Sequence, residues 1–147
     1  MNEQETGALI MGEIRVKVRL TNAWDEALSR RGQLPSDKVR EYVADAMVDT
    51  GAVRCVIPAQ VMQALGIQTR GQRVAEYADG RKEAVPISEA LIINILGRDT
   101  LEEAMVLGDE VLIGQTVLEK LDLWADCAGR RLVPNPAHPD QPVTKVK

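Results

Sequence analysis

The chain is poor in aromatic residues, cysteine and histidine. Its 147 residues include two tryptophans, two tyrosines and no phenylalanine, yet 45% of them are hydrophobic. We therefore expect one domain whose core is built from Val, Leu, Ile, Ala and Met. A net charge of −4 and the lack of a long basic run argue against nucleic acid as a partner.

Long hydrophobic runs and targeting signals are also lacking. The longest apolar run, LIINIL at 91–96, is far shorter than the roughly 20 residues that cross a bilayer. No positively charged segment precedes an apolar one at the N-terminus, as it does in a signal peptide. We therefore expect a cytoplasmic protein with no membrane partner, in which Cys55 and Cys127 are thiols rather than a disulfide.

The single histidine limits the possible chemistry. His138 lies in NPAHPDQP, a proline-rich segment, and the two cysteines form no CxxC pattern. A nucleophile activated by histidine, or a histidine-based metal site, would depend on that one residue. We therefore predict neither a metal ion nor an organic cofactor.

Alternation of apolar and polar residues predicts a mainly β fold. EIRVKVRL (13–20) carries its apolar residues on one face, as a half-buried strand does. Asp79-Gly80 is a signal for a two-residue hairpin turn, and the strand leaving it is expected to continue, past a break near Pro86, into 89–96. The segment 100–107 is predicted as a strand, although it also suits a helix. Further strands are predicted at 42–48, 53–57, 110–114, 123–126 and 130–134.

Two short helices are expected among the strands. One, at 58–65, has proline in its first turn and is followed by Gly66 as a C-terminal cap; the other, at 115–122, is apolar on one side. The polar segment 21–41 is predicted as an insertion that has room for a short helix at 23–30. We predict a domain at 13–133, between a flexible N-terminal segment (1–12) and a Pro-rich flexible tail (134–147).

One motif supports a hypothesis about chemistry. MVDTGA (47–52) ends an apolar strand on Asp49 and turns at once through Thr50, Gly51 and Ala52. Asp and Gly favour turns in any protein, so ordinary turn chemistry is one interpretation. A catalytic carboxylate held on a tight loop is the other.

The order of the motifs favours the catalytic interpretation. DTGA is followed by VIP (56–58), by the hairpin with Asp79-Gly80 at its tip, and by VLIG (111–114) before a helix. In this order the chain resembles the single-domain, retropepsin-like aspartic proteases of clan AA, of the bacterial type, over residues 13–133. The resemblance implies a mainly β acid-protease barrel with two short helices, active as a homodimer. The chain departs from viral members in the insertion, in a hairpin tip without a glycine-rich stretch, and in Gln115, which stands where they carry an arginine.

The resemblance assigns the central role to Asp49. Because the chain carries one such motif, a symmetry-related copy would supply the second carboxylate. Two carboxylates about 3 Å apart share one proton, so that one activates water while the other polarises the peptide carbonyl. Thr50, Gly51 and Ala52 would form the loop around Asp49, and the partners would be a second copy of the chain and a peptide or protein substrate.

The resemblance also assigns roles to two other segments. Ile113 and Gly114 would support the active-site loop by packing, and the flap over the substrate would consist of Tyr77, Ala78, Asp79 and Gly80. An ordinary exposed hairpin is the alternative for the flap, since Asp-Gly turns are common. For the whole chain, the alternative is a dimeric binding or assembly module on the same fold that does not cleave peptides.

Overall fold

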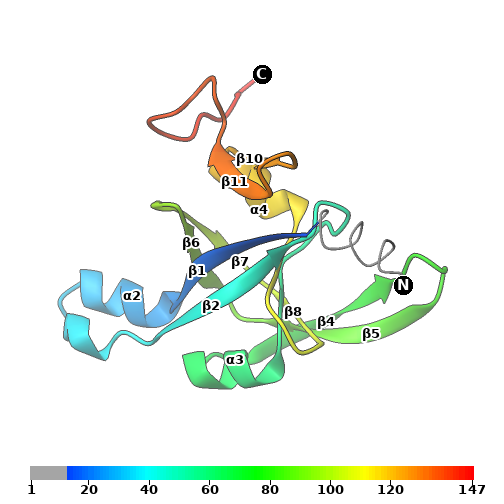
Figure 1. The fold of residues 1–147 in the computed structure, drawn as a ribbon. Helices are drawn as coiled ribbons and strands as arrows, with labels where there is room; N and C mark the ends of the chain where they lie inside the picture. Colours follow the sequence, from blue (N-terminus) through cyan, green and yellow to red (C-terminus); the bar gives the residue numbers. More distant parts are fainter. Residues whose placement is uncertain (1–12) are drawn as a thin grey trace.

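The computed structural model describes residues 13–147 and shows a mainly β chain (Figure 1). Within that range, nine strands form one sheet, two more form a separate hairpin, and three α-helices and a 3₁₀-helix accompany them. The strands are β1 (Ile14–Asn22), β2 (Glu41–Val48), β3 (Val56–Ile57), β4 (Thr69–Glu76), β5 (Lys82–Ser88), β6 (Leu91–Ile95), β7 (Arg98–Glu102), β8 (Met105–Val106), β9 (Leu112–Ile113), β10 (Leu123–Asp126) and β11 (Arg131–Pro134). The helices are α2 (Ala23–Arg30), η1 (Ser36–Lys38), α3 (Ala59–Leu65) and α4 (Gln115–Leu121).

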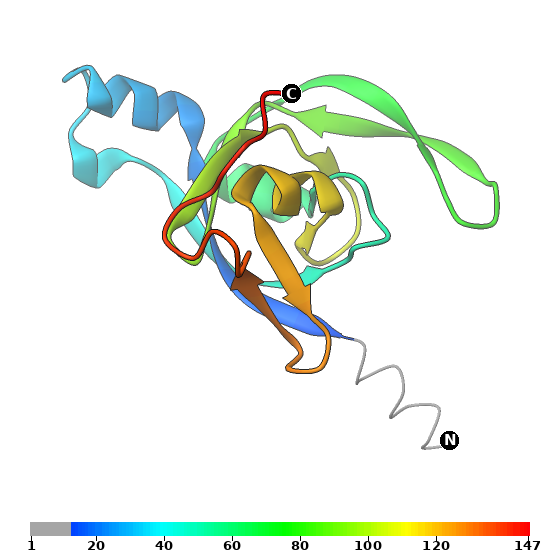
Figure 2. The same cartoon turned by 90° about the horizontal axis from the view of Figure 1, so that it is seen from above.

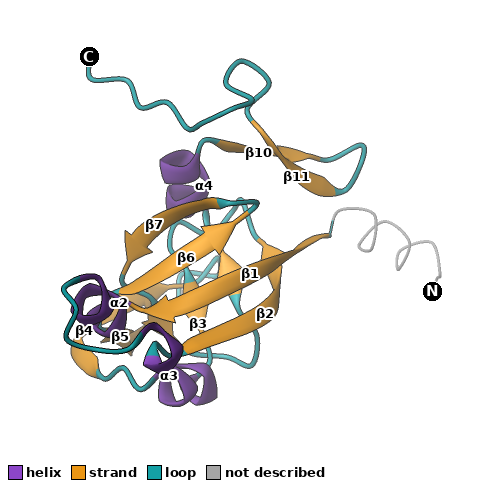
Figure 3. Ribbon diagram, turned by 90° about the vertical axis from the view of Figure 1, so that its left-hand side faces the viewer, coloured by secondary structure: helices purple, strands orange, loops and turns teal. Residues whose placement is uncertain are grey.

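The nine-stranded sheet runs in the order β4-β5-β8-β3-β9-β2-β1-β6-β7. Its longest strand, β1, pairs antiparallel with β2 on one side and with β6 on the other. In Figure 3, strands β7, β6, β1 and β2 form one continuous layer, with α4 and the β10–β11 hairpin above it. The order is far from sequential, so strands distant in the sequence meet at the centre of the sheet.

The core is aliphatic, as the composition requires. The predicted face of β1 supplies Ile14, Val18 and Leu20, each no more than 4% exposed. Helix α3 adds Val61 and Leu65, and α4 adds Val117, Leu118 and Leu121. Both tryptophans lie outside the core: Trp24 is 73% exposed and Trp124 is 54% exposed.

The insertion 21–41 is folded against the domain. Asn22 accepts a hydrogen bond from the Asp25 N–H at 2.9 Å and so caps α2, while its own amide group donates to the Leu65 carbonyl at 2.8 Å. The Arg40 Nε donates to the buried Asp25 carboxylate at 2.8 Å. A helix is therefore present at 23–30, where the sequence analysis allowed one. The prediction of two short helices is too low for the described residues, which contain three α-helices.

Three predictions about strands need correction. The segment 100–107 does not form one strand, because β7 pairs with β6 whereas β8 pairs with β3 and β5. Pro86 lies inside β5, and the break between the strands comes at 89–90. Because β8 pairs with β5 only at Ile87, position 86 needs no backbone N–H donor toward β8. The hairpin turn is longer than two residues: Tyr77 donates to the Arg81 carbonyl, and Gly80, with φ 87°, completes the loop between them.

The chain after β11 is attached to the domain through Asp122. This residue ends α4 with φ 57°, and its carboxylate accepts hydrogen bonds from Asn135 Nδ2 at 3.0 Å and the Val143 N–H at 3.1 Å. His138 Nδ1 lies 2.7 Å from the same carboxylate, and the buried Arg98 donates to the His138 carbonyl. The flexibility expected of the tail 134–147 stays a prediction, and the segment 1–12 lies outside the described residues.

Candidate active site

Strand β2 delivers Asp49 to the start of a tight loop. The N–H of Asp49 donates to the Ile113 carbonyl at 2.9 Å, since β2 and β9 run parallel and end side by side. The N–H of Gly51 donates to Asp49 Oδ1 at 3.0 Å, and the N–H of Ala52 donates to the Asp49 carbonyl at 3.0 Å. The carboxylate is thus oriented by backbone groups of its own loop.

The segment that leads from the end of β9 into the first turn of α4 is hydrogen-bonded to the loop after Asp49. Gln115 N–H donates to the Ala52 carbonyl at 2.8 Å, and Thr116 N–H donates to the Val53 carbonyl at 3.0 Å. Gly114 lies so close that a Cβ built on it would be 2.6 Å from the Arg54 carbonyl oxygen and 2.9 Å from that of Ala52. Glycine is therefore required here by the close approach of two chain segments.

The β4–β5 hairpin reaches out from the body of the domain, as Figure 2 shows. Its tip is ordered by side chains: the Tyr77 hydroxyl donates to Glu83 at 2.6 Å, and the Arg81 guanidinium lies 4.1 Å from the centre of the Tyr77 ring. The bond to Glu83 raises the pKa of the Tyr77 hydroxyl above its usual value, so this group is a neutral donor. The N–H of Arg81 donates to Asp79 at 2.9 Å.

The loop and the hairpin border one groove of about 660 Å³. Of the residues predicted for the site, the groove is lined by Asp49, Gly51, Ala52, Tyr77 and Ala78. Those that do not line it are Thr50, Asp79 and Gly80, which are exposed, and Ile113 and Gly114, which are buried.

The rest of the groove wall was not predicted from the sequence. It consists of Val53, Arg54 and Val56 after the turn, 73–76 on β4, and Met105, Leu107 and Leu112. Alternation along β4 could have indicated Ala75 and Arg73, which lie two and four residues before Tyr77. Met105 and Leu112 come to the groove by pairing with β3, which no local pattern predicts.

Cys55 lies beside the groove but is not a candidate nucleophile. Its side chain is completely buried, and burial, with a smaller contribution from Glu102, raises the pKa of the thiol to about 12. Since the thiolate is the reactive form, this cysteine is inert near neutral pH.

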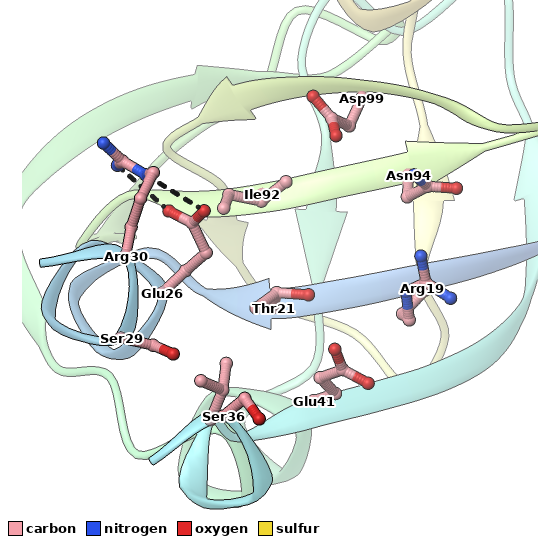
Figure 4. A pocket seen from close by; sticks show the side chains of 11 residues that line it. Arg19, Thr21, Glu26, Ser29, Arg30, Ser36, Glu41, Ile92, Asn94 and Asp99 are labelled. Carbon is pink, nitrogen blue, oxygen red and sulfur yellow. Dashed lines mark hydrogen bonds and ion pairs between the residues drawn. The ribbon is translucent and has the colours of Figure 1, made fainter. Parts of the chain in front are cut away.

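A second depression, of about 440 Å³, lies on the outer face of the sheet under α2 (Figure 4). It is polar, with Arg19, Thr21, Glu41, Asn94 and Asp99 on the strands and an ion pair between Glu26 and Arg30 at its edge. None of the residues predicted for the site lines it. Among residues 13–147, no group of His, Cys, Asp and Glu could hold a metal ion, and no helix in that range is long and apolar enough to cross a membrane.

Comparison with known proteins assigns the family. A family model described as "gag-polyprotein putative aspartyl protease" matches residues 38–120, which is more than half of the chain. The chain belongs to this aspartyl protease family. The matched part of the protease domain includes Asp49, the β4–β5 hairpin and Gly114. No curated protein matches the chain.

Two solved structures are similar to the protease domain. One is the foamy viral protease-reverse transcriptase in complex with an RNA/DNA hybrid, with 16% identity, a TM-score of 0.47, and coverage of 71% of this chain and 11% of that chain. The other is the simian foamy virus (mac) protease, with 12% identity, a TM-score of 0.45, and coverage of 71% and 90%. This chain thus spans about a tenth of the first of these proteins. The strand topology confirms the predicted mainly β fold, and the family model confirms the predicted aspartic protease family.

Proposed function

We propose that this protease domain is a homodimeric aspartic endopeptidase that hydrolyses peptide bonds with a water molecule activated by two symmetry-related Asp49 carboxylates. The observation that supports this most is the position of Asp49, on a loop held by backbone hydrogen bonds at a groove that is bordered by the β4–β5 hairpin. A peptide in extended form suits such a groove, whose walls are largely apolar. The proposed site needs no metal and no cofactor.

The need for a second chain follows from the chemistry. Peptide hydrolysis by carboxylates requires one that accepts a proton from water and one that donates a hydrogen bond to the scissile carbonyl. Glu76 also borders the groove, but its side chain belongs to the outer face of β4, opposite Lys82. A second Asp49, related by a two-fold axis, would complete the pair. Thr50, which is exposed next to Asp49, would then lie near the axis.

The β10–β11 hairpin is the proposed dimer surface. It forms a two-stranded sheet of its own, so that both of its outer edges lack a strand partner among residues 13–147. Trp124 on β10 is 54% exposed, and an exposed tryptophan beside an open strand edge is typical of an interface. The terminal strand segment RRLVP (130–134) would then join the two copies.

The test is a pair of measurements on the full chain and on Asp49→Asn. We expect a dimer in sedimentation for both, cleavage of a peptide library by the unchanged chain, and no cleavage by the variant, since an amide of nearly the same shape cannot act as the base. An inhibitor with a hydroxyl in place of the hydrated carbonyl should block cleavage. Full activity in the variant, or in a protein that is monomeric at every concentration tested, would contradict the proposal.

A dimeric binding module remains the second candidate, and the hairpin tip favours it. The tip is held by the Tyr77–Glu83 hydrogen bond and the Arg81–Tyr77 contact, and it has one glycine, so it is stiffer than a glycine-rich flap. A verified dimer that binds peptides but cuts none between pH 3 and 8 would establish this function instead. The cytoplasmic location of either form stays a prediction.

A further inference from the structure

The inner face of the β4–β5 hairpin carries a positive charge. Arg73 lies opposite Val85 in the ladder, and directly opposite residues in antiparallel strands project on the same face. Val85 is 3% exposed, so this face is turned toward the body of the domain and the groove. Val74 belongs to the other face and is 62% exposed. The Arg73 guanidinium therefore extends from the groove-facing side of the hairpin.

Arg73 has no ion-pair partner among the described residues. It takes part in no ion pair or side-chain hydrogen bond within residues 13–147, whereas Arg70 on the same strand is paired with Glu103. Of the nearby acids, Glu76 is on the outer face opposite Lys82. Glu83 is on the same inner face as Arg73, and its carboxylate accepts the hydrogen bond of a tyrosine hydroxyl at 2.6 Å. The charge of Arg73 is thus available to whatever occupies the groove.

Arg54, in the loop after Asp49, is a second cation among the residues that line the groove. Its Nη2 donates a long hydrogen bond to the Glu103 carbonyl, at 3.5 Å, and lies 3.9 Å from the carboxylate of that residue, which already binds Arg70. Its Nε is buried and has no hydrogen-bond partner among the described residues. The residues that line the groove thus include two arginines, while Asp49 and Glu76 are its acids.

We infer that Arg73 and Arg54 select peptides with a glutamate or aspartate side chain near the scissile bond. The inference rests on the proposed function, because it assigns specificity to the same groove. An arginine binds a carboxylate through paired, charge-assisted hydrogen bonds, which are stronger than neutral ones and which discriminate against the amide. The remaining wall, including Val56, Met105 and Leu112, accepts apolar side chains on either side of the acidic one.

The experiment compares peptides that differ at one position. A set is made in which each position around the cleaved bond is in turn Glu, Gln or Lys, and kcat/KM is measured for the unchanged chain, Arg73→Gln and Arg73→Glu. We expect a preference for Glu over Gln of about tenfold at one position at least, its loss in Arg73→Gln, and a preference for Lys in Arg73→Glu. Lys82→Gln, which removes a cation from the outer face of the same hairpin, should keep the preference.

A measurement of peptide binding distinguishes a failure of this inference from a failure of the proposed function. Anisotropy with labelled Glu and Gln peptides is measured on Asp49→Asn and on the double variant Asp49→Asn/Arg73→Gln, neither of which needs to cleave. Tighter binding of the Glu peptide by the first and not by the second supports the inference even if the unchanged chain cuts nothing. Equal binding and equal cleavage of the Glu and Gln peptides at every position would overturn it, while cleavage itself would still support the protease.

Discussion

The N–H of Asp49 lies 2.9 Å from the carbonyl oxygen of Ile113. This bond joins the end of β2 to the end of β9, and it places the DTGA turn next to the LIG segment. The position of the Asp49 carboxylate therefore depends on packing at Gly114, immediately after Ile113. The first prediction tests this dependence.

Gly114→Ala should destabilise the active-site loop. A Cβ at this position would be 2.6 Å from the Arg54 carbonyl oxygen, and a backbone group cannot move aside as a flexible side chain can. We expect a loss of about 1–3 kcal/mol in the free energy of unfolding, as for other overpacked sites, together with loss of any peptidase activity. Gly71→Ala is the control, because nothing lies within 4 Å of the added carbon; equal stability of the two variants in urea would refute the explanation.

Asp25→Asn should lower stability in a pH-dependent way. The Arg40 side chain, through its hydrogen bonds, holds the pKa of the buried Asp25 carboxyl below its usual value, more than offsetting burial, which raises it. The ionised form thus stabilises the fold above about pH 4, and this stabilisation is lost as the pH falls through the lowered pKa.

At pH 7 the free energy of unfolding of Asp25→Asn should be about 1–3 kcal/mol lower than that of the unchanged chain. The difference should shrink as the pH falls through the lowered pKa, where the carboxyl of the unchanged chain itself becomes protonated. Urea unfolding at several pH values measures both. Asp37→Asn, an exposed position of the same insertion, should have little effect, and a difference for Asp25→Asn that stays constant with pH would contradict the prediction.

The two cysteines should differ sharply in reactivity. Cys127 is exposed in the β10–β11 turn, whereas Cys55 is buried with a thiol pKa of about 12. We expect iodoacetamide at pH 8 to modify Cys127 in the folded chain and both residues in guanidinium, as read by mass spectrometry. Cys127→Ser should leave the folded chain unmodified, and rapid labelling of Cys55 in that variant would show that this part of the core opens easily.

The attachment of the tail should be lost in acid. Hydrogen bonds from Asn135, from the Val143 N–H and from His138 lower the pKa of Asp122, despite an opposing effect of burial. The carboxylate therefore holds these groups above about pH 4, and the attachment weakens as the pH falls through the lowered value. Hydrogen exchange of the Val143 amide should be faster in Asp122→Asn than in the unchanged chain, where this amide is bonded.

Asp140→Asn is the matched control for the tail, because Asp140 is an exposed acid in the same segment. It should leave the exchange of the Val143 amide unchanged. If Val143 exchanges as fast as the last residues of the unchanged chain at neutral pH, the tail is flexible, as the sequence alone predicts.

Local patterns determined the elements that surround the candidate site. The apolar run 42–48 followed by Asp49-Thr50-Gly51 predicts a strand that ends in a tight turn, because alternation and turn chemistry depend on neighbours in the sequence. Gly66, with φ 70°, ends α3 as predicted for the same reason. The order of these motifs was enough to indicate the protease family, which the family model then confirmed.

Only the tertiary structure decided which distant residues meet. The segment 100–107 divides into β7 and β8 because its two halves pair with different strands. No pattern of residues within the segment predicts this division. The same holds for Arg73 and Arg54, which reach one groove from the hairpin and from the loop after Asp49. Strand order and side-chain pairing depend on the burial of surfaces that are far apart in the chain. The turn at Asp49 can therefore be predicted from its neighbours in the sequence, whereas the walls of the groove are determined by the folded sheet.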